Sequence, residues 1–146
     1  MKKAILTVGA IFLFAITAVR AQGDSKVVNA NASNPNAPVI SFDNKVHDYG
    51  TIKQDGDPNC EFTFKNTGKE PLILTNCRAS CGCTVPDWPK EPILPGKTGK
   101  IKVHYDTHRI GQFNKTITVT SNAKNSEEMI TIKGNVEAPP AAPSGK

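Results

Sequence analysis

Cys60-Glu61-Phe62-Thr63-Phe64-Lys65-Asn66 alternates apolar and polar residues, and this alternation decides the fold. A period of two places one set of side chains on a buried face and the other in water, as in a strand of an antiparallel sheet. The same pattern continues through 100–106, 115–121 and 129–136. An amphipathic helical repeat of useful length is not found. The sequence therefore predicts an all-β domain.

Turn signals separate these segments from one another and from three shorter apolar runs. Gly, Pro, Asn, Asp and Ser gather at 55–58, 66–68, 95–97 and 121–123, as they do in tight turns. With the runs at 39–42, 46–52 and 71–76, about seven short strands are expected. Such a series is typical of a single antiparallel immunoglobulin-like β-sandwich. An OB-like barrel is the alternative, but the helix that it requires is not indicated.

The ends of the chain differ in composition from its centre. Residues 1–21 combine a basic start, an apolar run and small residues ahead of Gln22, which predicts a cleavable signal peptide, with a retained anchor helix as the alternative. Residues 22–38 and 138–146 are rich in Asn, Ala, Ser and Pro, so a disordered linker and a disordered tail are expected. The sandwich domain is then expected over 39–137, a length that can enclose one core.

The predicted signal also sets the expected location. We expect an exported protein, periplasmic or secreted, which is soluble after signal removal because no later segment is apolar for long enough to span a membrane. No cysteine lies near the cleavage point, so a lipid anchor is not expected. Removing Lys2, Lys3 and Arg20 from 18 basic residues leaves 15 against 13 acidic ones. These charges are interspersed, and no nucleic-acid partner is predicted.

Ser80-Cys81-Gly82-Cys83-Thr84 carries the most distinctive chemistry in the sequence. A disulfide between cysteines one residue apart needs an unusual backbone geometry, which the central glycine can adopt. The small ring is expected to be strained and more easily reduced than a structural disulfide. As a dithiol, the pair Cys81 and Cys83 would suit a soft ion such as Cu(I). The motif is therefore interpreted either as a loop staple or as a metal or thiol-redox site.

Zinc is a further alternative at this motif. Because zinc needs about four ligands, histidines would have to complete the site. The chain contains three of them: His47, His104 and His108.

Cys60 and Cys77 are predicted to form a second disulfide. If 60–66 and 71–77 form a hairpin, one register sets the two cysteines directly opposite each other, within disulfide reach. That register places Phe62 and Phe64 on the opposite face of the hairpin from Leu72 and Leu74. A register shifted by one residue aligns those faces and needs a bulge before Cys77. Two independently buried thiols are the alternative.

Trp88 follows the thiols in a proline-rich loop, Val85-Pro86-Asp87-Trp88-Pro89. It is expected either to cover the edge of the core or to offer an aromatic surface to a partner. Neither a phosphate-binding glycine loop nor a local cysteine–histidine signature is present. The sequence therefore predicts that the protein is not an enzyme.

A series of short motifs resembles a family of bacterial exported domains of unknown function. The motifs are Tyr49-Gly50-Thr51-Ile52, Phe62-x-Phe64-x-Asn66-Thr67-Gly68-x-x-Pro71-Leu72-x-Leu74, Ser80-Cys81-Gly82-Cys83-Thr84, Pro95-Gly96, Gly111-x-Phe113-x-Lys115 and Ser121-Asn122. The resemblance covers about 42–136. It implies an immunoglobulin-like sandwich related to the major-sperm-protein and pilus-chaperone type, and it implies no biochemical role. Cys60 and Cys77 depart from that family's pattern, in which apolar residues are usual.

Two functional hypotheses follow. The leading one is a non-enzymatic exported module that binds or scaffolds another envelope protein or surface component, through a strand edge or the Trp88 loop. The alternative is a thiol-based redox or Cu(I) protein that uses Cys81 and Cys83. No other cofactor is expected.

Overall fold

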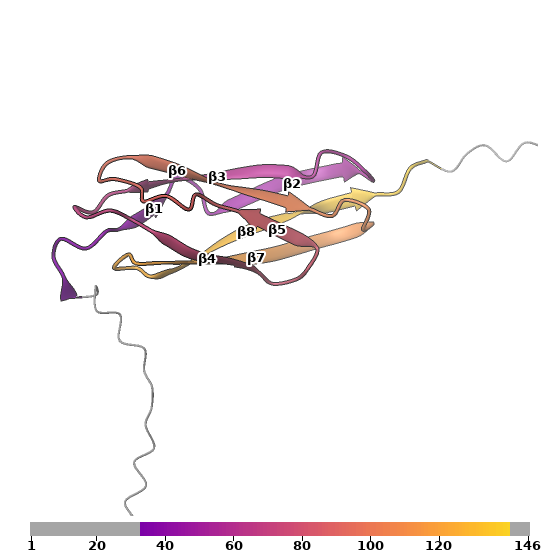
Figure 1. The fold of residues 1–146 in the computed structure, drawn as a ribbon. Coiled ribbons are helices and arrows are strands. Elements are labelled where there is room, and N and C mark those ends of the chain that lie inside the picture. The colour runs from indigo at the N-terminus through magenta and orange to yellow at the C-terminus, as the bar shows by residue number, and fades with distance from the viewer. Residues whose placement is uncertain (1–32, 141–146) are drawn as a thin grey trace, which may run out of the picture.

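Eight strands in two facing sheets make up the computed structural model of this protein, which describes residues 33–140 (Figure 1). One sheet has the order β1 (Ile40–Phe42), β3 (Asn59–Asn66), β6 (Thr98–Tyr105) and β5 (Thr84–Asp87). The other has the order β2 (Val46–Lys53), β8 (Glu127–Glu137), β7 (Gly111–Ser121) and β4 (Leu74–Ala79). The predicted all-β, immunoglobulin-like sandwich is confirmed, with eight strands instead of about seven.

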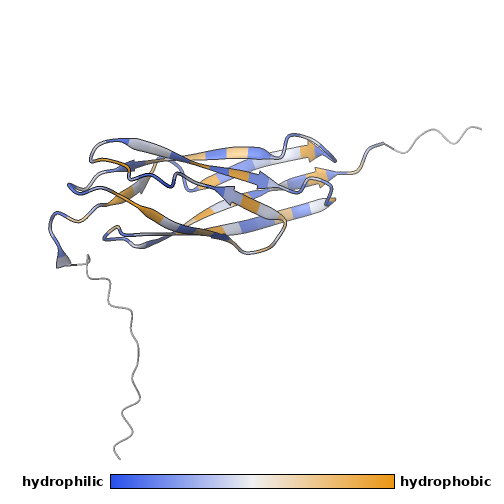
Figure 2. Cartoon of the chain, in the orientation of Figure 1, coloured by the Kyte–Doolittle hydropathy of each residue, from blue (hydrophilic) through white to orange (hydrophobic). Residues whose placement is uncertain are grey.

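The apolar residues of the alternating segments face the core, and the polar residues between them face solvent. In β3, Cys60, Phe62 and Phe64 are buried, while Glu61 and Lys65 are exposed. Figure 2 shows the same alternation of apolar and polar positions along the strands of both sheets. Burial of large apolar side chains between the sheets is the main stabilising contribution to such a fold. Within residues 33–140, no helix is long and apolar enough to cross a membrane.

Pairing within the sheets is antiparallel, with one exception. β2 runs parallel to β8, and its register shifts between Asp48 and Thr51. Gly50 lies at this shift with a φ of 61°, a left-handed conformation that glycine adopts at little cost. The exception is a difference from the antiparallel sandwich that the sequence predicts.

The predicted hairpin of residues 60–77 is wrong, because β3 and β4 belong to different sheets. The turn signal at 66–68 marks a crossing from one sheet to the other. Asn66 is fully buried, and its amide nitrogen donates to the carbonyls of Glu70 (2.8 Å) and Ile93 (2.9 Å). Its amide oxygen accepts a hydrogen bond from the Gly68 backbone (3.0 Å). These contacts hold the chain on a path that leaves the sheet.

The linker predicted over 22–38 is wrong for its last residues. Ala37 and Pro38 are buried, and a Cβ on Gly68 would come within 2.5 Å of Pro38 Cα. Burial of these two residues against the domain offsets the conformational entropy that is lost when they become ordered. Composition alone did not indicate this burial. The signal peptide predicted for 1–21, linker residues 22–32 and tail residues 141–146 lie outside the described residues.

Candidate functional site

Cys81 and Cys83 form a disulfide in the connection between β4 and β5, with their Cα atoms 5.3 Å apart. This connection, residues 80–83, leads from an edge strand of one sheet to an edge strand of the other. The Ser80 backbone donates to Thr116 O (2.9 Å), and the Thr84 backbone donates to Cys81 O (3.4 Å). The disulfide therefore closes the turn by which the chain changes sheets.

Gly82 does not have the backbone geometry that the sequence led us to expect. The glycines with positive φ among residues 33–140 are Gly50, Gly96 and Gly111. Apart from the two adjoining cysteines, a Cβ placed on Gly82 would meet no atom within 4 Å. Neither backbone conformation nor crowding inside the domain therefore requires glycine between the two cysteines.

The two sulfurs differ in their surroundings. Cys81 is partly exposed, whereas only 5% of Cys83 is accessible to solvent. The hydroxyl of buried Thr84 lies 3.9 Å from each Sγ. Thr84 pairs with Tyr105 across the sheet, and the Tyr105 ring stacks on Phe113 with centroids 3.9 Å apart. The two cysteines therefore differ in exposure, and the residue that follows them is paired with a buried aromatic residue.

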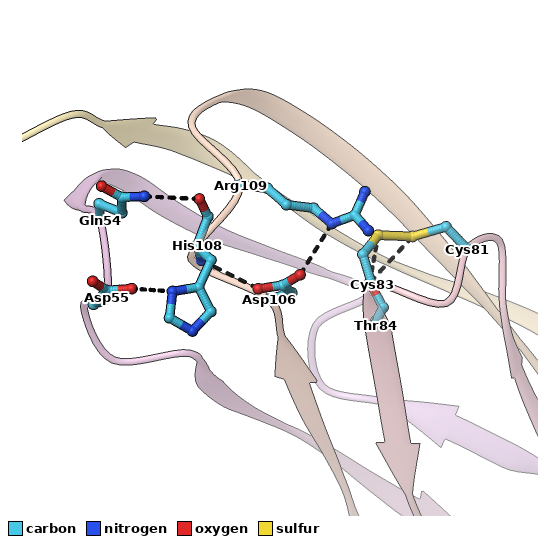
Figure 3. A network of polar contacts seen from close by, with 8 residues as sticks. All are labelled: Gln54, Asp55, Cys81, Cys83, Thr84, Asp106, His108 and Arg109. Carbon is cyan, nitrogen blue, oxygen red and sulfur yellow. Dashed lines mark hydrogen bonds and ion pairs between the residues drawn. A yellow bond between two sulfur atoms is a disulfide. The ribbon is translucent and has the colours of Figure 1, made fainter.

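The loop between β6 and β7 borders the disulfide (Figure 3). Its first residue, Asp106, donates its backbone N–H to Cys83 O at 2.9 Å. The Asp106 carboxylate accepts hydrogen bonds from Arg109 Nε (3.0 Å) and from the His108 backbone (3.2 Å). The bond from Arg109 lowers the pKa of Asp106 below its usual value. In Figure 3, the Arg109 side chain extends toward the disulfide.

The loop between β2 and β3 braces the same loop from its other side. Gln54 Nε2 donates to His108 O (3.0 Å), and the Asp55 backbone donates to Thr107 O (3.3 Å). Asp55 also pairs through its carboxylate with His108 Nδ1. Asp55 has a φ of 62°, which aspartate tolerates better than most residues. Three loops are thereby joined into one polar end of the sandwich, which we call the disulfide end: residues 54–58, 80–83 and 106–110.

A shallow pocket of about 300 Å³ lies at this end, between two of its loops. Its lining residues are Asp55, Gly56, Pro58, His104, Tyr105, Asp106, Thr107 and His108. No set of three His, Cys, Asp or Glu side chains within residues 33–140 is arranged to hold a metal ion. The pocket therefore offers polar contacts to a ligand or partner but lacks a preformed metal centre.

Each of the three histidines considered as zinc ligands contacts a side chain other than Cys81 or Cys83. His47 packs edge-on against Tyr49 at 4.5 Å, and the His104 ring is 3.2 Å from Asn59 Oδ1. His108 pairs with Asp55. In the disulfide form neither sulfur carries a thiolate, so the Cu(I) hypothesis concerns the reduced pair only.

The predicted disulfide between Cys60 and Cys77 is not formed, and both are buried free thiols. Cys60 pairs with Val103 in one sheet, and Cys77 pairs with Val119 in the other. The prediction failed because it assumed a hairpin. Burial raises the pKa of Cys60, and it raises the pKa of Cys77 to about 12. Both are therefore unreactive thiols that occupy apolar core positions.

Trp88 follows β5 and packs against the hydrophobic core while remaining partly exposed. Lys90 Nζ lies 3.0 Å from the centre of its ring, a cation–π contact. Its indole Nε1 is buried without a hydrogen-bond partner among the described residues. The placement fits a cover over the core edge; a role in partner binding stays a prediction.

The sequence did not indicate that Asp55, Asp106 and Arg109 belong to the same end of the sandwich as the thiols, where Asp106 alone contacts Cys83 directly. The i,i+3 spacing of Asp106 and Arg109 was an available signal for their ion pair. Their position beside Cys83 was not, because it depends on how β5 and β6 pair.

Similar structures share the fold of this domain. A protein of unknown function from Porphyromonas gingivalis W83 superposes with a TM-score of 0.62 at 15% identity, over 69% of this chain and 48% of that one. PapD-like domain 7 of human CEP192 gives 0.60 at 8% identity, over 73% and 91%. The VesB protease of Vibrio cholerae gives 0.54 at 15% identity, over 73% and 33%. This chain thus spans about half or less of two of these proteins.

Comparison with known families gives a match over nearly all of the sandwich. No curated protein matches the chain. Residues 40–136 match the family described as a protein of unknown function, DUF1573. The match begins at β1 and ends in β8, so it includes the disulfide turn and both loops beside it. The chain therefore belongs to the DUF1573 family.

Proposed function

We propose that this protein is a non-enzymatic, exported immunoglobulin-like module that binds or scaffolds another component of the cell envelope, and that it does so through the disulfide end. The loops at the ends of a sandwich are where this architecture commonly carries binding residues. Here three loops are joined by backbone hydrogen bonds, and a disulfide closes one of them. Preorganised loops lose little conformational entropy on binding, which favours affinity.

The observation that carries the proposal is Ile110, which is 57% exposed in the loop that borders the disulfide. It lies next to Arg109, whose side chain is 65% exposed. An exposed apolar residue beside an arginine on a braced loop is a combination that protein interfaces favour, because apolar and arginine side chains supply much of the binding energy. The proposed partner surface is therefore apolar at its centre and carries an acidic group for Arg109.

Site-specific photo-crosslinking in the producing cell tests this proposal. A photoreactive phenylalanine analogue at position 110 is expected to give one discrete adduct in the envelope fraction. Leu94 is the matched control, since it is 55% exposed and precedes β6 at the opposite end of the sandwich. Adducts of equal yield from both positions, or from position 94 alone, would contradict the proposal.

A second candidate function is thiol–disulfide redox chemistry at Cys81 and Cys83, with Cu(I) binding by the reduced pair as its metal variant. The observation that favours it is a disulfide in which one of the two cysteines is partly exposed, at the disulfide end of the domain. Reduction of the purified protein by a dithiol under native conditions tests the redox function. Titration of the reduced protein with Cu(I), against the Cys81→Ser/Cys83→Ser variant, tests the metal variant.

A further inference from the structure

We infer that the Cys81–Cys83 disulfide exchanges with a protein dithiol in a fixed direction, in which the incoming thiolate attacks Cys81 Sγ and Cys83 is the leaving thiolate. The inference rests on the redox function proposed above and deepens it. Disulfide exchange requires the attacking thiolate to reach one sulfur. Cys81 is the partly exposed member of the pair and Cys83 is 5% exposed, so the two sulfurs do not compete equally for the attack.

A polar group lies close enough to stabilise a leaving thiolate at Cys83. Thr84 Oγ1 lies 3.9 Å from Cys83 Sγ and equally far from Cys81 Sγ, so its hydroxyl can donate a hydrogen bond to either sulfur anion and does not itself set the direction. Asp106 is hydrogen-bonded to the Cys83 backbone and to Arg109, which keeps that guanidinium on the disulfide side of the loop (Figure 3). A nearby cation stabilises a thiolate and makes it a better leaving group.

Gly82 supports approach from outside. It is exposed, its φ is not in the left-handed region, and a side chain there would enter open space. The domain itself therefore does not require glycine between the cysteines. A partner that must bring its own sulfur within bonding distance of Cys81 does benefit from the missing side chain.

The chain's remaining thiols do not interfere with this exchange. Cys60 and Cys77 are buried on the inner faces of the two sheets and remain free. Burial raises the pKa of both thiols, so the thiolate form that would attack a disulfide is scarce at neutral pH. Exchange is therefore confined to the pair at the disulfide end.

The reaction balances as a transfer of two electrons. The partner's first thiolate forms a bond to Cys81 Sγ, the Cys81–Cys83 bond breaks, and Cys83 leaves as a thiolate that then takes a proton. The partner's second thiolate attacks the partner's first sulfur, the mixed disulfide breaks, and Cys81 leaves as a thiolate. The partner dithiol is oxidised to a disulfide, and the domain is reduced to a dithiol.

Trapping the mixed disulfide on the full chain tests this direction. The probe is thioredoxin with its second active-site cysteine replaced by serine, so that the intermediate cannot resolve. After acid quenching and alkylation, peptide mass spectrometry is expected to place the adduct on Cys81 and the alkyl group on Cys83. An adduct on Cys83 would overturn the inference and leave the redox function standing. Absence of reduction by intact reduced thioredoxin would overturn both.

Rates from two variants test the role of the surroundings. Arg109→Gln is expected to slow reduction by thioredoxin about three- to tenfold, because it removes the cation whose side chain extends toward the disulfide (Figure 3). Lys97→Gln, which removes an exposed cation beyond the other end of β6, is the control and is expected to leave the rate unchanged. Circular dichroism confirms that both variants are folded. Equal rates for Arg109→Gln and wild type would overturn the assignment of Arg109.

Discussion

Replacing Asn66 with alanine is expected to lower the free energy of unfolding by about 3 kcal/mol. The side chain is fully buried and makes hydrogen bonds with the backbones of Gly68, Glu70 and Ile93 at 2.8–3.0 Å. A buried hydrogen bond contributes about 1 kcal/mol net, so three contribute about 3 kcal/mol. Backbone groups left without a partner add to the loss where water cannot reach them.

Urea unfolding followed by fluorescence measures this loss, because Trp88 is the only tryptophan in the chain. A domain of this size loses about 1–3 kcal/mol of stability per molar urea, so the midpoint is expected to fall by about 1–3 M. Asn114→Ala is the control: it changes an exposed asparagine on β7 and should alter stability by less than about 0.5 kcal/mol. If Asn66→Ala costs less than about 1 kcal/mol, Asn66 does not hold the crossing between the sheets.

Two further predictions follow from packing and charge. Gly99→Ala should destabilise the domain by about 1–3 kcal/mol in the same assay, since its Cβ would lie 2.5 Å from the ring of buried Phe64. Gly82→Ala is the control and should leave the free energy of unfolding unchanged. Equal losses of stability in the two variants would contradict the packing around Gly99. Asp106 has a pKa lowered chiefly by Arg109, so its contribution to stability is present above the unfolded-state pKa and is lost as pH falls through the folded-state pKa. Asp106→Asn should therefore lose less stability than wild type between about pH 5 and pH 2, and identical acid profiles would refute the ion pair.

The sequence predicted the sandwich because its core strands alternate strictly. Residues 60–66 bury Phe62 and Phe64 as the pattern indicates, and alternation of this kind reports burial on one face directly. β5 was missed because it is short, contains Pro86 and has no clear alternation. The parallel pairing of β2 with β8 could not be predicted, because alternation specifies which side chains are buried and not which strand lies beside which.

The candidate site was predicted only at its centre. The spacing of Cys81 and Cys83 indicated either a disulfide staple or a metal or thiol-redox site, and the structure contains the disulfide. The pairing of Cys60 with Cys77 was wrong because a turn signal does not distinguish a hairpin from a crossing between sheets. Asp106 joins the site through a backbone hydrogen bond to Cys83, and Arg109 joins it through Asp106. Local sequence carries no information on the contact between Asp106 and Cys83.

The cysteine connectivity, on which both the disulfide end and the buried thiols depend, can be mapped directly. The full chain would be unfolded at acid pH, alkylated without reduction, digested and examined by mass spectrometry. We expect one peptide in which Cys81 and Cys83 are joined, and separate alkylated peptides for Cys60 and Cys77. A cross-linked peptide that joins Cys60 to Cys77, or alkylated Cys81 and Cys83, would contradict this connectivity.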